Sequence, residues 1–157
     1  MEMTELEMNI GHIFIDKKLL ERALTTNAWV NEHSIPDTDR IQSQEAFRTL
    51  GDAVLKLILV DILVAKGIED SGKITEDKKD AENRKKLSRI SRKFNVGKFM
   101  KMGKGEKEHN KIYDNDDNLA ETLEALIGAV YLDVGFDATK KVIMKWPDFE
   151  RLLYNIP

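Results

Sequence analysis

The chain has 157 residues, of which 41% are hydrophobic and 34% charged, the balance of a globular protein with a single core, so we expect one domain over residues 1–157. The absence of cysteine excludes disulfides and thiolate metal sites, and Lys56 and Asp61 interrupt the longest apolar run, residues 54–65, which argues against a membrane span. The acidic start MEMTELEMN lacks the apolar core of a secretory signal, so we expect a soluble, cytoplasmic protein.

Apolar residues recur at helical spacing along the chain, and no alternating strand pattern of useful length is present, which predicts an all-α fold. Residues 6–10 predict one short helical turn. Asp16 is a candidate N-cap for a helix over KKLLERALT, and residues 33–42 predict a loop because they contain proline and two aspartates. Ser43 begins a long helix that Gly67 ends.

The second half of the chain predicts further helices. We expect a turn at residues 70–72, followed by one charged helix that includes residue 75 and residues 78–94. A glycine-punctuated mobile loop follows at residues 102–111, and then a long helix from residue 118 to 132 or 133. Asp117 or Asn118 caps the long helix and Gly135 ends it. Asp137 caps a last helix, which Pro147 kinks or restarts.

The net charge of −3 conceals a basic middle of the chain. Residues 73–107 carry 13 basic and 5 acidic side chains, a net charge of +8, between flanks of −6 and −5. This block is suited to a local contact with a polyanion such as a nucleic acid. A solvated, lysine-rich helix face would show the same composition.

Two stretches place acidic residues along one face of a helix. The first, EAFRTLGDAVL, supplies positions i, i+3 and i+7: Glu45, Arg48 and Asp52. The second, around LAETLEALIGAVYLD, supplies positions i, i+4 and i+7: Asp117, Glu121 and Glu124. A glycine inside a helix costs about 1 kcal/mol, so Gly51 and Gly128 predict a close helix crossing that brings the stripes together. Facing carboxylates suit a hard cation, although acidic stripes are more often solvated surface.

These stretches resemble the signature motifs of the ribonuclease III family. The family motifs read close to NERLEFLGDAVL and LADTFEALIGAIYLD, and here the matching segments are QEAFRTLGDAVL and LAETLEALIGAVYLD. The resemblance covers about residues 5–146. It implies an all-helical, ribonuclease III-like endonuclease domain that forms a homodimer. It also implies Mg²⁺-dependent hydrolysis of double-stranded or structured RNA, with Mn²⁺ as a substitute, leaving 5′-phosphate and 3′-hydroxyl ends.

The resemblance also implies roles for individual residues. The family's signature Glu, Asp, second-motif Asp and last Glu fall on Arg48, Asp52, Glu121 and Glu124, and its opening Glu falls on Glu45. It therefore implies that the catalytic residues are Asp52, Glu124, Glu121 and Glu45. It implies Asp52, Glu121 and Glu124 as metal ligands. Asp117 lies one helical turn before Glu121, so we expect it to support the metal through water. An aromatic residue that helps to dock the partner subunit in many members is Thr49 here.

Arg48 is the main departure from the family pattern. It changes the local formal charge from −4 to −2, and its guanidinium can pair with Asp52, Glu45 or Glu124. Three interpretations follow. In the first, the protein is an endoribonuclease with a weaker, rearranged metal site completed by Asp117 or Glu45. In the second, it is a catalytically impaired protein that binds RNA or a ribonucleoprotein through Arg48. The third interpretation is a helical dimerisation module without an RNA role.

Basic side chains are the candidate contacts to RNA. A-form RNA is recognised mainly by shape and by its phosphates and 2′-hydroxyls, so spread cations suffice. The candidates are Arg48, Lys78, Lys85, Arg89, Arg92, Lys104 and Lys107. We expect a protein without the double-stranded-RNA-binding domain that many family members append. It would therefore depend on a preferred RNA or on a helper protein.

Overall fold

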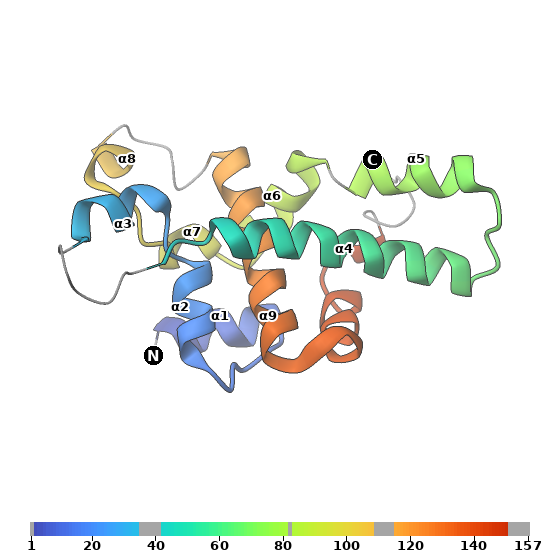
Figure 1. Ribbon diagram of the computed structural model, residues 1–157, viewed down its shortest axis with the longest axis horizontal. Coiled ribbons are helices and arrows are strands. Elements are labelled where there is room, and N and C mark those ends of the chain that lie inside the picture. Colours follow the sequence, from blue (N-terminus) through green and yellow to red (C-terminus); the bar gives the residue numbers. More distant parts are fainter. Residues whose placement is uncertain (1, 35–41, 82, 109–114, 151–157) are drawn as a thin grey trace.

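The computed structural model describes residues 2–34, 42–81, 83–108 and 115–150, and it is built from helices (Figure 1). In chain order the helices are α1 (Glu2–Ile10), α2 (Lys17–Ala23), α3 (Asn27–His33), α4 (Glu45–Ala65), α5 (Ser71–Ala81), α6 (Arg84–Lys93), α7 (Val96–Phe99), α8 (Lys104–Glu108) and α9 (Asp116–Met144). Within these ranges the only extended pairing is an isolated bridge between Thr25 and Lys101, so the predicted all-α fold is confirmed. No helix of the described part is long and apolar enough to cross a membrane.

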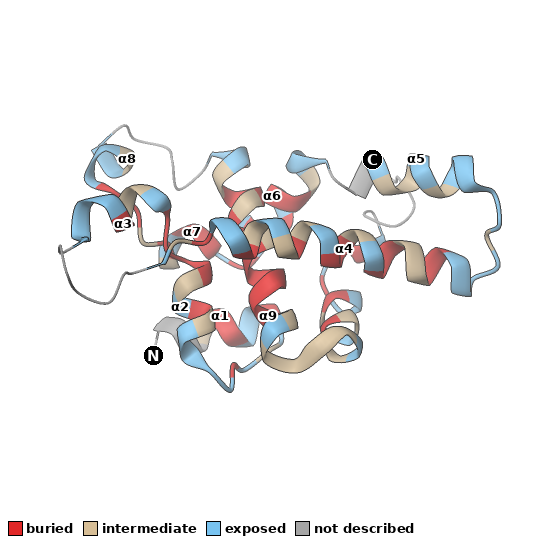
Figure 2. Cartoon of the chain, viewed as in Figure 1, coloured by how far each residue is buried: buried red, intermediate tan, exposed pale blue. Residues whose placement is uncertain are grey.

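The centre of the fold is the crossing of α4 and α9. Helix α4 runs along the length of the molecule, and α9 passes across it, while α6 packs against α9 (Figure 1). The buried faces of the two long helices meet there (Figure 2). They are lined by the apolar residues expected from the helical spacing: Val54, Ile58, Leu123, Ile127 and Val130. Burial of these side chains fixes the position of each helix, and with it the position of the acidic face that each helix carries on its other side.

Two glycines allow the two helix backbones to touch. A Cβ atom on Gly51 would lie 1.6 Å from the Glu124 carbonyl oxygen, and one on Gly128 would lie 2.3 Å from the Phe47 carbonyl oxygen. Any other residue would force the helices apart. The predicted glycine crossing is therefore confirmed, and it places Asp52, which follows Gly51, beside the turn of α9 that carries Glu124.

Several predicted helix ends are also confirmed. The Asp16 carboxylate accepts a hydrogen bond from the Lys18 N–H at 2.9 Å and caps α2. Gly67 follows α4 with a φ of 82°, a conformation that favours glycine. Gly135 has φ 81° and ψ 179°, so the helical backbone of α9 is broken where the sequence predicts it.

The predicted turn at residues 70–72 and the single charged helix through residue 94 are wrong. Ser71 and Gly72 already belong to α5, and the charged segment forms two helices, α5 and α6. The reason is Asn83, whose backbone is extended and whose side chain accepts the Lys85 N–H at 3.0 Å, so that a new helix begins at Arg84. This second start directs α6 across α9.

Other boundaries also differ from the prediction. The short turn at residues 6–10 is the end of the longer α1, and the predicted mobile loop contains α8, with its residues 109–111 outside the described chain. The cap of α9 is Asn115, which accepts the N–H groups of Asp117 and Asn118. Helix α4 starts after Gln44, whose side chain makes no capping bond, and α9 ends at Met144, before Pro147. Residues 35–41 of the predicted loop lie outside the described residues.

Candidate active site

A pocket of about 350 Å³ lies at the crossing of the long helices. Helix α4 contributes Arg48, Thr49 and Asp52 to its lining, α9 contributes Glu121 and Glu124, and α6 contributes Arg84. The structure therefore brings together three of the acidic residues that the sequence singles out. Glu121 and Glu124 lie one turn apart on α9, and Asp52 comes from α4, which crosses it.

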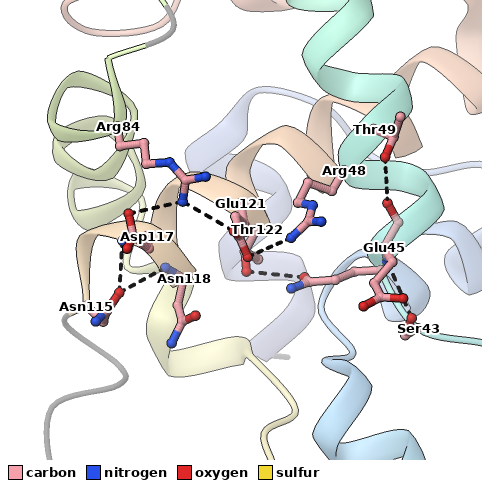
Figure 3. A network of polar contacts seen from close by, with 11 residues as sticks. Ser43, Glu45, Arg48, Thr49, Arg84, Asn115, Asp117, Asn118, Glu121 and Thr122 are labelled. Atoms are coloured by element: carbon pink, nitrogen blue, oxygen red, sulfur yellow. Dashed lines mark hydrogen bonds and ion pairs between the residues drawn. The ribbon is translucent and has the colours of Figure 1, made fainter.

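Arg48 forms an ion pair inside this pocket. Its Nη1 lies 2.9 Å from Oε2 of Glu121 (Figure 3). The sequence suggested Asp52, Glu45 or Glu124 as its partner, so that expectation is corrected. The reason is the helix register: Thr122 Oγ1 donates to the Gln44 side-chain oxygen at 3.2 Å, which places this turn of α9 opposite the first turns of α4.

Arg84 is a second arginine in the pocket, and the sequence did not place it there. Its Nη1 lies 3.0 Å from Oδ1 of Asp117 and 3.3 Å from Oε1 of Glu121 (Figure 3). The hydrogen bond to Asp117 is the main cause that raises the pKa of the Arg84 guanidinium. Each carboxylate oxygen of Glu121 thus contacts a different arginine. The sequence signal that could have located Arg84 is Asn83, because a cap there starts α6 at the arginine.

The charge of Asp52 is balanced along its own helix. Lys56 lies one turn further along α4, and its Nζ is 2.8 Å from Oδ2 of Asp52. Both side chains are about one third exposed, so the pair is a weak, solvent-screened contact. Asp52 is therefore able to exchange the lysine for another cation at small cost.

Glu124 has a perturbed carboxyl group. Burial raises its pKa to about 7, and the negative charges of Asp52 and Glu121 add to this effect, whereas Arg84 and Arg48 oppose it. About half of the Glu124 side chains are therefore protonated at neutral pH. The raised pKa means that burial and the neighbouring carboxylates together outweigh the two arginines at this side chain.

The donor atoms allow a test of whether this pocket fits a divalent cation. Among the residues that the structure describes, no group of three or more His, Cys, Asp or Glu side chains is placed to hold a metal ion. The four-carboxylate site implied by the family resemblance therefore does not fit, because Arg48 occupies one position and Glu121 contacts two arginines. Asp52 and Glu124 line the same pocket, and Mg²⁺ commonly takes one or two carboxylates together with water and phosphate oxygens, so these two side chains are the candidates to hold it.

Two predicted supporting residues do not line the pocket. The Glu45 side chain is exposed, and its backbone carbonyl accepts a hydrogen bond from Thr49 Oγ1 at 3.3 Å. Asp117 contacts the pocket only through Arg84. Their roles in catalysis or metal binding stay predictions.

Apart from Arg48 on α4, the candidate RNA contacts are spread over three helices. Lys78 lies on α5, Lys85, Arg89 and Arg92 lie on α6, and Lys104 and Lys107 lie on α8. Six of the ten residues of α6 are Lys or Arg, and this helix begins at the pocket with Arg84. Helix α8 lies beside α3 instead (Figure 1). The basic surface that adjoins the pocket is therefore that of α6, although Arg92 pairs with Asp116 at 2.7 Å.

Comparisons with known proteins find similar sequences over most of the chain. Residues 16–147 match the family model described as Ribonuclease-III-like. Ribonuclease 3 of Caldanaerobacter subterraneus subsp. tengcongensis is 38% identical over 90% of this chain, and ribonuclease 3 of Natranaerobius thermophilus is 35% identical over 91%. The chain spans about 60% of the length of these curated relatives.

Solved structures give the same result for the fold. A structure of the nuclease domain of ribonuclease III from Campylobacter jejuni superposes with a TM-score of 0.79 and 28% sequence identity, over 97% of this chain and 98% of that one. A second structure of the same domain gives a TM-score of 0.77 and 30% identity. The first of these structures concerns flexibility in a region involved in dimer formation of that domain.

Proposed function

Because the chain belongs to the ribonuclease III family, we propose that it is an endoribonuclease that hydrolyses double-stranded or structured RNA with Mg²⁺ or Mn²⁺. The observation that carries this proposal is the pocket at the glycine crossing, where Asp52 faces Glu121 and Glu124. In this proposal residues 1–157 form one ribonuclease III-like domain.

The proposed chemistry uses the two carboxylates that fit a cation. Asp52 and Glu124 would hold the divalent ion, which would supply an activated water and neutralise charge on the scissile phosphate. Glu124 ligates only as the carboxylate, so its proton must leave before the ion binds. Lys56 releases Asp52 for the same purpose and stays near enough to balance the added phosphate charge.

The two arginines supply positive charge to the pocket, in which Arg48 replaces a carboxylate of the family pattern. Arg48 and Arg84 lie within 3.3 Å of Glu121 and keep that side of the pocket neutral without a second cation. Their guanidinium groups suit the oxygens of a phosphodiester. The consequence is weaker metal binding than four carboxylates would give, combined with a stronger contribution from RNA phosphates.

A homodimer is part of the proposal, because a two-fold axis gives two sites, one for each strand of a duplex. Leu57 and Val64 stand two helical turns apart on α4 with 56% and 57% of their area exposed. Apolar side chains in such a row are typical of a surface that packs against a partner. The exposed cations of α6 would then extend each pocket along the RNA backbone.

The direct test is incubation of the purified chain with labelled duplex RNA in Mg²⁺ or Mn²⁺, beside Glu124→Gln and a surface control, Glu69→Gln. We expect metal-dependent cleavage that leaves 5′-phosphate ends, is unchanged in the surface control and disappears in Glu124→Gln. Cleavage that persists in Glu124→Gln, or in excess chelator, would contradict the proposal.

A second candidate function is supported by the ion pair of Arg48 with Glu121. In this alternative the chain is a catalytically impaired member of the family that binds RNA or a ribonucleoprotein. The same experiment separates the two functions. No cleavage in either metal, together with salt-sensitive binding of the duplex, would support the binding protein and reject the enzyme.

A further inference from the structure

The two arginines in the pocket are placed as a pair. Arg48 comes from α4 and Arg84 from α6, and their Nη1 atoms contact opposite oxygens of Glu121 at 2.9 and 3.3 Å. The exposed fraction of the side chains is 38% for Arg48 and 56% for Arg84, against 24% for Glu121. The Glu121 carboxylate lies between the two arginines (Figure 3), and its side chain is less exposed than either of theirs.

This arrangement resembles a phosphate site that already holds an anion. Arginine offers a planar set of donors that matches carboxylate and phosphate oxygens equally well. Arg84 is also the first residue of α6, so the positive end of that helix adds to the local field. Half-exposed ion pairs contribute little stability and open readily, so an arriving phosphate can replace Glu121.

We propose that Arg48 and Arg84 together bind one phosphodiester group of RNA, and that Glu121 is an internal competitor that occupies both arginines while the RNA is absent. The inference rests on the proposed action on RNA. It assigns Arg84 to the site and gives Glu121 a task other than metal binding. When the phosphate takes the arginines, the Glu121 carboxylate is released from both of them.

The competition predicts that RNA affinity, measured in the absence of metal, rises when Glu121 loses its charge. Removing the charge of Glu121 frees Arg48 and leaves Arg84 paired with Asp117 alone, so Glu121→Gln should bind duplex RNA more tightly than the unmodified protein. Loss of any acid in the pocket also reduces general repulsion of RNA. The matched control is therefore Glu124→Gln, measured at pH 8, where Glu124 is mostly charged and where no ion pair with an arginine is lost.

The measurement is fluorescence anisotropy of a labelled RNA duplex in excess chelator at several salt concentrations. We expect Glu121→Gln to gain about two- to fivefold more affinity than Glu124→Gln, the factor expected for two weak ion pairs. Arg84→Ala should weaken binding and lower the salt slope by about one. Lys98→Ala, which removes another ion-paired cation outside the pocket, should leave the affinity within about twofold.

The outcomes separate this inference from the function on which it rests. An extra gain in Glu121→Gln that vanishes when Arg48 and Arg84 are both changed to alanine supports the competition. An equal gain in Glu121→Gln and Glu124→Gln, or a gain that persists without the arginines, overturns it while RNA binding stands. If the unmodified chain binds no duplex at any salt concentration, both the inference and the proposed function fail. Circular dichroism of each variant verifies that it is folded.

Discussion

Glu124 connects the stability of the protein to pH. Its pKa of about 7 lies above the ordinary value of 4.5, so between these pH values the folded state binds more protons than the unfolded state. The free energy of unfolding therefore falls as the pH rises through this window. The shift corresponds to about 3 kcal/mol before solvent screening, and we expect on the order of 1–2 kcal/mol in practice because the side chain is partly exposed.

Urea unfolding at pH 5 and pH 8 measures this effect. Glu124→Gln is neutral at both pH values, so its stability advantage over the unmodified protein should be small at pH 5, near the lower end of the window, and larger at pH 8. A variant whose advantage is the same at both pH values would show that Glu124 does not titrate in this range.

Arg48 limits the affinity of the pocket for divalent ions. Arg48→Glu replaces a cation by the carboxylate of the family pattern and frees one oxygen of Glu121. We expect at least about a tenfold gain in Mn²⁺ affinity by isothermal titration calorimetry, because the local charge becomes more negative by two units. Arg48→Gln, which removes the cation without adding a ligand, should gain less. Equal Mn²⁺ affinity for the unmodified protein and Arg48→Glu would reject the placement of Arg48 in the cation pocket.

At the scale of helices, the α4–α9 crossing depends on two glycines. Gly51→Ala would put a methyl group 1.6 Å from a backbone oxygen, which neither helix can avoid without separating. We expect a loss of more than about 3 kcal/mol in the free energy of unfolding, or no folded protein. Gly105→Ala is the control, since a Cβ atom there meets nothing within 4 Å. A Gly51→Ala variant as stable as this control would mean that the helices do not touch.

The crossing could be predicted because its signals are local. Gly51 and Gly128 stand inside amphipathic helices, and each apolar face identifies the acidic face opposite. Arg84 could not be placed in the same way, since its position depends on the break before α6 and on how α6 packs across α9. The partner of Arg48 was missed for a similar reason: the Thr122–Gln44 contact sets the helix register, and no spacing within either helix encodes it.

For the whole molecule, the expected assembly is a homodimer. The chain mass is 18.0 kDa, so light scattering should report about twice this value at micromolar concentration. Leu57→Glu places a charge in the exposed row on α4 and should shift the mass towards the monomer. Met144→Glu, at an exposed apolar position near the end of α9, should not. A monomer in the unmodified protein would remove the two-site arrangement from the proposal.

The molecule combines a charge-balanced pocket with a basic helix, and both follow from the same fold. Helix α6 supplies Arg84 to the pocket and presents its remaining cations to solvent, while the net charge of −3 keeps the rest of the surface unfavourable for RNA. RNA is thus expected to approach along α6. Its phosphates then reach the pocket at Arg84, the first residue of that helix.

The most direct test of this account is a crystal structure of the protein soaked in Mn²⁺ at pH 8, with the ion located by its anomalous scattering. We expect one ion coordinated directly by Asp52 and Glu124, with Glu121 still in contact with Arg48 and Arg84. An ion bound elsewhere, or none at saturating Mn²⁺ with the two carboxylates directed away from each other, would contradict the proposed site.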